Sequence, residues 1–215
     1  MFSYATVEPF FPTPVWIHDL EPDTAARLNP ELMQTIDEIT SPRPAIAPGA
    51  SWQTEQSLHK LDQFAELTGI IHFATENILK FLEIDYEGFE ITGCWANLNP
   101  KGAWHKAHSH GNNYLSGVYY VRAPAGADSI TFHDPRIQVE QISPRVLKRN
   151  AHNSSAHTIQ VQDGRLLMFP AWFGHSVAPN PTDELRVSIS FNIMFTAFSE
   201  THSPPRWEGL PVRRD

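Results

Sequence analysis

The sequence predicts a mainly β fold, a sandwich or barrel, with helices in the N-terminal part. Apolar residues recur near helical spacing over residues 54–82, which predicts one long helix or two abutting helices with an interruption at Gly69. After Gly88 the pattern changes to short alternating segments separated by Gly, Pro, Asn and Asp, and it continues to about Phe198. Many short strands with few helices between them are typical of antiparallel sandwiches and barrels.

The first forty residues predict one extended segment and one short helix. Residues 1–22 are rich in proline and aromatic side chains, which suit an edge strand and extended packing better than a helix. Residues 29–40 predict a helix in which Asn29 caps the N-terminus and Pro30 takes the first helical position. We expect both elements to pack on the β structure that follows them.

The length and composition are those of one domain with a substantial core, since the chain has 215 residues of which 41% are hydrophobic. We expect a single domain over 1–215, in which residues 1–87 hold the extended segment and helices, 88–198 the β core and 199–215 a C-terminal arm. The expected strands are 89–98, 103–108, 114–122, 128–133, 137–141, 144–148, 155–161, 165–169, 175–178 and 185–197.

The charge balance excludes several kinds of partner. The 16 basic and 24 acidic residues give a formal net charge of −8 without any dense Lys/Arg block, which argues against nucleic acid as a partner.

The single cysteine, Cys94, cannot form an internal disulfide, and the first residues lack the pattern of a secretory signal. No apolar stretch approaches the roughly 20 residues that span a bilayer. We therefore expect a soluble cytoplasmic protein with no membrane partner.

Three histidines lie within six positions directly before a predicted strand, in AWHKAHSHGNNYLSGVYYV. Successive side chains of a strand point to opposite faces, so His108 and His110 point the same way from Cα atoms roughly 6.5–7 Å apart. His105 has the opposite parity in a regular strand and is the weakest ligand of the three. A distant segment, GRLLMFPAWFGHSV, offers His175 after an apolar strand and a proline turn. Two imidazoles from one strand and one from elsewhere can form an open metal site.

The segment LRVSISFNIMF, residues 185–195, alternates polar and apolar side chains. The ordinary interpretation is a half-buried antiparallel strand whose polar face meets water. If that face instead lines the interior of a barrel, Arg186 is a buried cation that requires a carboxylate, and Ser188 can donate to the same anion. The pattern by itself leaves both interpretations open.

In combination, these motifs resemble the double-stranded β-helix oxygenases that use iron and 2-oxoglutarate. HSHGNNYLSGVYYV, ITFHDPR, GRLLMFPAWFGHSV and LRVSISFN carry a narrower resemblance, over about residues 95–195, to a family of bacterial and phage proteins in that class. The resemblance implies a jelly-roll barrel of the cupin-like superfamily. It also implies a hydroxylase-type dioxygenase that depends on Fe(II) and 2-oxoglutarate, consumes O₂ and releases succinate and CO₂.

Carried over to single positions, the resemblance implies that His108 and His175 bind iron. The usual second ligand in this superfamily is Asp or Glu, but His110 stands at the equivalent position here. The histidines His108, His110 and His175 would then form both the metal site and the catalytic centre. Replacing a carboxylate by a neutral imidazole leaves the site one unit more positive, which should alter its redox potential and its preferred ion.

The same resemblance implies a cosubstrate site. Arg186 with Ser188 would bind the distal carboxylate of 2-oxoglutarate, and Tyr120 occupies the position at which related enzymes place a tyrosine on that carboxylate. Tyr119 has the opposite parity and suits packing. Asn97, on the preceding strand, could reach the other end of the cosubstrate, and a structural amide is an equal alternative.

Two further functions stay open as alternatives. The spacing of glycines around His108, His110 and His175 is similar to the two motifs of cupins, although the glutamate expected after the first motif is absent. A cupin-type dioxygenase or isomerase would not use 2-oxoglutarate, and it predicts a structural role for Arg186. A non-catalytic sensor would bind metal and ligand without turnover. The motifs leave open whether the substrate is a small molecule or a peptide, and a homodimer is the default oligomer.

Overall fold

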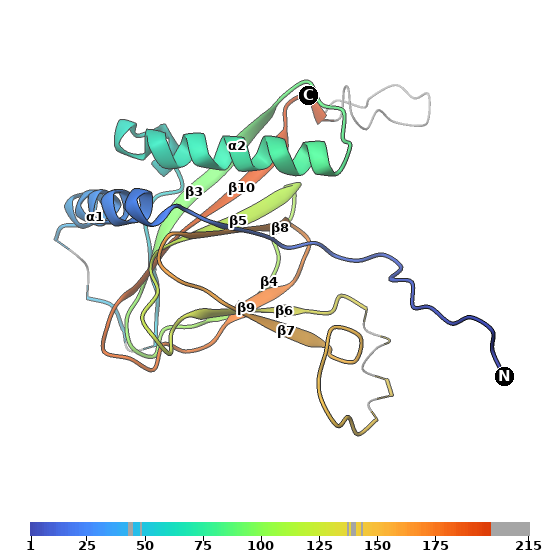
Figure 1. Cartoon of the computed structure of the whole chain (residues 1–215). Helices are drawn as coiled ribbons and strands as arrows, with labels where there is room; N and C mark the ends of the chain where they lie inside the picture. Colours follow the sequence, from blue (N-terminus) through green and yellow to red (C-terminus); the bar gives the residue numbers. More distant parts are fainter. Residues whose placement is uncertain (43–44, 48, 137, 139–140, 143, 199–215) are drawn as a thin grey trace, which may run out of the picture.

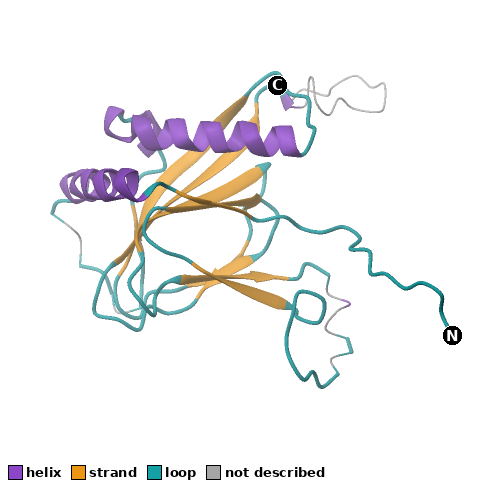
Figure 2. Cartoon of the chain, viewed as in Figure 1, coloured by secondary structure: helices purple, strands orange, loops and turns teal. Residues whose placement is uncertain are grey.

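Two antiparallel sheets face each other, and two helices cover the outer face of the larger sheet (Figures 1 and 2). This computed structural model describes residues 1–42, 45–47, 49–136, 138, 141–142 and 144–198. The strands are β1 (Trp16–Asp19), β2 (Trp52–Gln53), β3 (Phe89–Asn99), β4 (His105–His108), β5 (Leu115–Arg122), β6 (Ser129–His133), β7 (Ala156–Gln160), β8 (Arg165–Pro170), β9 (His175–Val177) and β10 (Arg186–Phe195). Over the described residues, the larger sheet has the order β1-β8-β5-β10-β3-β2 and the smaller one β4-β9-β6-β7.

The helices α1 (Pro22–Ile39) and α2 (Ala65–Phe81) each bury an apolar stripe against the larger sheet. The core between them includes Leu28, Leu32, Ile36, Leu67, Ile71 and Ile78 from the helices and Tyr119, Ile189 and Phe191 from the strands. Within the described part of the chain, neither helix combines the length and the apolar character that a membrane crossing requires.

A second core fills part of the space between the two sheets. It includes Val118, Tyr120, Ile130, Phe132, Leu167, Phe169 and Phe173. Because side chains alternate along β5, Val118 and Tyr120 face this interior while Tyr119 and Val121 face the helices. The larger sheet therefore has a helix-covered face and an inner face, and the inner face carries the polar residues of the site.

The structure confirms a double-stranded β-helix with N-terminal helices, but the first helix differs from the expected one. α1 begins at Pro22 rather than at residue 29, so Pro30 lies inside the helix. Asn29 is no cap, because its side-chain oxygen accepts a hydrogen bond from the Tyr119 hydroxyl at 2.6 Å. From the sequence, Pro30 was expected to be the first residue of the helix. In the structure Pro22 takes that first position.

The segment before α2 also differs in detail from the prediction. The 3₁₀ turns η1 (Leu58–Lys60) and η2 (Asp62–Phe64) precede α2, so the interruption comes before Ala65. Gly69 lies inside α2, and open space surrounds the position that a side chain would take there. A glycine on an uncrowded helix face does not by itself end a helix.

Eight of the expected strands correspond to β3 to β10, with ends that shift by a few residues, and the expected edge strand near the N-terminus is β1. The expected strand 144–148 is wrong, because these residues form no strand. β6 and β7 pair directly with each other, and residues 144–148 lie in the connection between them. The expected strand 137–141 lies largely, and the arm 199–215 wholly, outside the described residues.

Candidate active site

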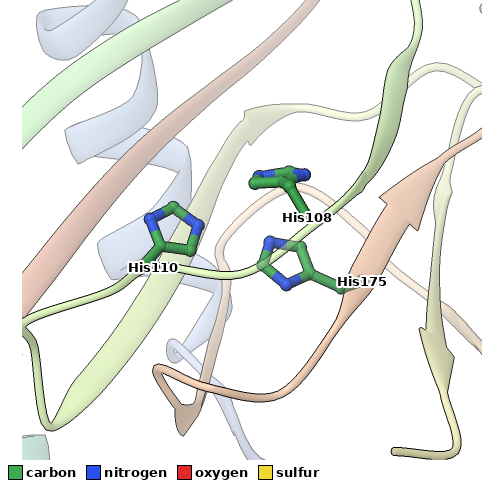
Figure 3. Close-up of side chains that lie close together, drawn as sticks. All are labelled: His108, His110 and His175. Atoms are coloured by element: carbon green, nitrogen blue, oxygen red, sulfur yellow. The ribbon is translucent and has the colours of Figure 1, made fainter.

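Three imidazoles from two paired segments meet at one end of the smaller sheet (Figure 3). His108 ends β4 and His175 begins β9, and the two residues lie opposite each other in the antiparallel pairing. His110 lies two residues beyond β4, where its backbone N–H donates to the Ala171 carbonyl at 2.8 Å. The ligand atoms of the three residues all lie within 4.8 Å of one another. A loop contact, not a regular strand, therefore places His110 beside the other two.

Backbone carbonyls orient two of the three rings. His108 Nδ1 lies 2.8 Å from the Lys106 carbonyl oxygen, and His175 Nδ1 lies 3.0 Å from that of Phe173. A carbonyl oxygen only accepts, so each Nδ1 carries the hydrogen and each Nε2 presents a lone pair. Such a contact fixes the ring and strengthens it as a metal ligand.

Burial keeps the imidazoles of His110 and His175 neutral. It lowers the pKa of His175 to about 4, an effect that the Phe173 carbonyl opposes in part. It also lowers the pKa of His110 to about 4, and the neighbouring His108 adds to the shift. Neutral imidazole is the form that binds a metal ion. In the described part of the chain no Asp or Glu lines the surrounding pocket, so an ion here would have only neutral protein ligands.

Arg186 lies in the same pocket and is 2% exposed. Its Nη1 makes one long hydrogen bond to the Ala127 carbonyl at 3.4 Å, and its buried Nη2 has no hydrogen-bond partner among the described residues. Burial lowers the pKa of Arg186, and the nearby Tyr120 opposes this shift. The half-buried interpretation of this strand is thus wrong at Arg186, because its polar face lines the interior.

Two hydroxyl groups lie beside this guanidinium. Tyr120 on β5 pairs with Ser188 on β10, and both residues line the pocket that holds Arg186. Burial raises the pKa of Tyr120, so its hydroxyl stays protonated and can donate. The structure brings the three residues together, while their role toward a cosubstrate stays a prediction.

Asn97 lines the pocket within a network of hydrogen bonds. Its Oδ1 accepts from Gln53 Nε2 at 2.8 Å and from Trp95 Nε1 at 3.2 Å. Its Nδ2 donates to Ser190 Oγ at 2.9 Å. These contacts favour the structural-amide alternative, because both ends of the amide already have partners.

His105 also lines the pocket, which strand parity did not predict. The pairing of β4 with β9 shifts by one residue between His105 and His108, so the extra residue returns His105 to the inner face. There its Nε2 lies 3.0 Å from Asn99 Oδ1, and burial lowers its pKa to about 4. An amide oxygen only accepts, so His105 Nε2 carries a hydrogen and is not available as a metal ligand.

The sequence analysis assigned no role to several residues that line the pocket: Gln53, Trp95, Asn99 and Ser190. Ser190 continues the alternation of β10 and could have been found from it. Gln53 comes from a two-residue strand far away in the sequence, and no local pattern marks it.

A protein-family model matches the part of the chain that holds this pocket. The model described as "Putative 2OG-Fe(II) oxygenase" matches residues 93–192, which contain the three histidines and Arg186. The matched stretch, 100 of the 215 residues, is similar to the 2OG-Fe(II) oxygenase family. The three imidazoles and the partnerless buried guanidinium of this chain fit Fe(II) and 2-oxoglutarate, the two ligands for which the matched family is named. A search of curated proteins finds no significant match.

Solved structures share the fold of this oxygenase. The α-ketoglutarate-dependent epimerase SnoN of nogalamycin biosynthesis is 14% identical with a TM-score of 0.62, over 94% of this chain and 92% of that one. A prolyl-4-hydroxylase from Pseudomonas putida is 16% identical with a TM-score of 0.59, over 85% and 93%. HygX from Streptomyces hygroscopicus, with nickel and 2-oxoglutarate bound, is 11% identical with a TM-score of 0.59, over 87% and 85%. At such identities the similarity shows the fold alone.

Proposed function

We propose that this oxygenase binds Fe(II) through His108, His110 and His175, binds 2-oxoglutarate through Arg186, and hydroxylates an organic substrate. The observation that carries the proposal is the buried, partnerless Nη2 of Arg186 in one pocket with three clustered imidazoles. Leaving a buried guanidinium nitrogen without a partner is costly, and a carboxylate of the cosubstrate would satisfy it in a charge-assisted hydrogen bond.

The chain's own residues would orient the cosubstrate. Arg186 and the hydroxyls of Tyr120 and Ser188 present donors to the distal carboxylate, while the apolar core beneath them excludes water. Bound Fe(II) supplies the activation of O₂ for oxidative decarboxylation. In balance, R–H, O₂ and 2-oxoglutarate become R–OH, succinate and CO₂.

The charge of the site suits a dianion. Metal-bound imidazoles are neutral and no carboxylate lines the pocket, so the ion and Arg186 leave a net positive charge that 2-oxoglutarate compensates. His110 in place of a carboxylate makes the site one unit more positive than a site with two histidines and one carboxylate. We expect it to hold the cosubstrate firmly and the ion less firmly than such a site.

The cupin-type alternative predicts a purely structural role for Arg186. A structural arginine in a dry interior is normally paired with a carboxylate or with several carbonyls. Arg186 has one long contact to a carbonyl, so the binding role is favoured.

The experiment is anaerobic reconstitution with Fe(II), addition of 2-oxoglutarate and then of O₂, with succinate as the product measured. We expect succinate from the wild type and about 30- to 100-fold weaker binding of 2-oxoglutarate in Arg186→Gln, because a charge-assisted pair is lost. His108→Ala and His175→Ala should fail to retain the metal.

Arg122→Gln is the matched control, since Arg122 ends the neighbouring strand β5 and is exposed. It should bind 2-oxoglutarate as the wild type does. Equal affinity for 2-oxoglutarate in Arg186→Gln and the wild type would refute the assignment of Arg186 to the cosubstrate. A wild type that binds Fe(II) and 2-oxoglutarate but forms no succinate would indicate a sensor.

A further inference from the structure

The ring of His110 is held differently from the other two imidazoles of the cluster. Backbone carbonyls orient the rings of His108 and His175 through Nδ1. His110 is anchored through its backbone N–H, which donates to the Ala171 carbonyl, and over the described residues no hydrogen bond fixes its ring. A histidine that binds a metal ion almost always has a second contact that orients its ring. Another group must therefore take this role for His110.

The indole of Trp95 lies against the His110 ring. The two ring centroids are 6.1 Å apart and the planes are inclined by 31°, which is within the range of aromatic contacts. The rings of His108 and His175 are also close to His110, at 5.1 and 5.3 Å, but both belong to the cluster itself. Among the ring contacts of His110 in the described part of the chain, Trp95 is thus the neighbour from outside the cluster.

The indole of Trp95 is buried and bounded at both ends. It lines the pocket and is 7% exposed. At one end its Nε1 donates to Asn97 Oδ1 at 3.2 Å. At the other end Cζ3 lies over Gly93, where an added Cβ would be 3.6 Å from it. A buried indole N–H requires an acceptor, so Asn97 determines how the ring is oriented.

Asn97 is in turn fixed by the strands on both sides of β3. Its Oδ1 also accepts from Gln53 of β2 at 2.8 Å, and its Nδ2 donates to Ser190 of β10 at 2.9 Å. The amide can rotate only if it gives up these hydrogen bonds. The larger sheet therefore sets the position of the indole through Asn97.

We propose that Trp95, oriented by Asn97, is the positioning residue that holds the His110 ring toward the metal ion; this inference rests on the proposed function, in which His110 is the third ligand. The indole takes the role that backbone carbonyls have for His108 and His175. A ligand that is already ordered binds its ion more tightly, because no side-chain entropy is lost on binding.

The test is titration of the metal-free, full-length protein with Co(II) in place of Fe(II), without 2-oxoglutarate, followed by visible absorption. Trp95→Leu and Asn97→Leu should each bind Co(II) about tenfold more weakly than the wild type, as is typical when a group behind a metal ligand is lost. Trp95→Phe retains an aromatic ring but loses the hydrogen bond to Asn97. Its affinity should lie between those of the wild type and Trp95→Leu.

Trp52→Leu is the matched control, since Trp52 lies on the neighbouring strand β2 and packs against the helix-covered core. It should lower stability in urea and leave the affinity for Co(II) unchanged. A second comparison uses His110→Ala. Because Trp95 acts through His110, adding Trp95→Leu to His110→Ala should weaken Co(II) binding no further.

Three results would overturn the inference: a Trp95→Leu variant that binds Co(II) as the wild type does, an equal loss of affinity in Trp52→Leu, or an effect of Trp95→Leu that is as large in His110→Ala as in the wild type. An unchanged Co(II) affinity in Asn97→Leu would also contradict it, because Asn97 would then not orient the indole.

His110→Ala alone separates this inference from the proposed function. If it binds Co(II) as tightly as the wild type, or if the wild type binds no Co(II), the proposed metal site is wrong. If His110→Ala binds more weakly while Trp95→Leu and Asn97→Leu are unchanged, the metal site stands and only the positioning role is wrong.

Discussion

Tyr119 and Tyr120 are adjacent on β5 and point to opposite faces of the larger sheet. The Tyr119 hydroxyl donates to Asn29 of α1 within the helix-covered core, whereas Tyr120 lines the pocket with Arg186. One step along a strand thus separates a residue that stabilises the fold from one that we assign to the cosubstrate.

Exchanging each tyrosine for phenylalanine should have separate effects. Tyr119→Phe leaves the buried Asn29 oxygen without its donor, so the free energy of unfolding should fall by about 1–2 kcal/mol with 2-oxoglutarate affinity unchanged. Tyr120→Phe should weaken 2-oxoglutarate binding several-fold with little loss of stability. Urea unfolding and titration with 2-oxoglutarate measure the two effects. If Tyr119→Phe weakened 2-oxoglutarate binding and Tyr120→Phe lowered stability instead, the assignment of the two tyrosines to opposite faces of the sheet would be refuted.

His108, His110 and His175 were expected to converge, and their ligand atoms do lie together. The reason differs in part, because a loop contact and not strand parity places His110. The position of His105 was not predictable, because a bulge in the β4–β9 pairing inverts its parity and the sequence carries no mark of it.

Among the elements, α1 has a proline in its interior that destabilises the helix locally. Pro30 lies in the middle of the helix, where it has no N–H to donate to the carbonyl of the preceding turn. Asn29, directly before it, is held by Tyr119 in a conformation that a residue before proline resists. Packing of α1 on the sheet compensates for this local cost.

Pro30→Ala should therefore stabilise the protein. It restores a backbone donor at a position of the helix interior, and we expect the free energy of unfolding to rise by about 1–2 kcal/mol. Thermal or urea unfolding measures the change, with Ala26→Gly at an exposed position of the same helix as a control that should destabilise. A loss of stability in Pro30→Ala would mean that packing of the proline ring outweighs the missing hydrogen bond.

Elements were predictable from the sequence where periodicity and tertiary partners agree. β3, β5 and β10 have clear patterns and lie beside one another in the larger sheet. Residues 144–148 were also expected to form a strand, yet they form none. Pairing is decided by topology, which alternation alone does not contain.

For the whole molecule, the burial of neutral histidines makes stability depend on pH. Burial lowers the pKa of His18 and His59, and that of His105 to about 4. In the unfolded chain each histidine titrates near pH 6.5. Between about pH 4 and pH 6.5 the unfolded chain then binds more protons than the folded one, so the free energy of unfolding rises with pH in this window.

Acidification of the metal-free protein from about pH 7.5 to about pH 5 should lower its stability by roughly 2–3 kcal/mol, or its Tm by roughly 5–10 °C. Differential scanning calorimetry in the presence of a chelator measures this. His59→Gln, which removes one of the buried imidazoles, should reduce the dependence. A Tm that does not change with pH would contradict the neutral burial of these rings.

The overall architecture was predictable because a change of periodicity at Gly88 divides helices from strands, and the motif resemblance supplied the jelly roll.

The most direct measurement is anaerobic titration of the metal-free protein with Fe(II) in the presence of 2-oxoglutarate, followed by visible charge-transfer absorption. We expect a band that saturates at a single Fe(II) per chain in the wild type and in His133→Ala, whose ring contacts Ser176 outside the cluster. The band should disappear in His108→Ala and His175→Ala. A wild type without the band, or a His175→Ala variant that keeps it at full intensity, would contradict the account.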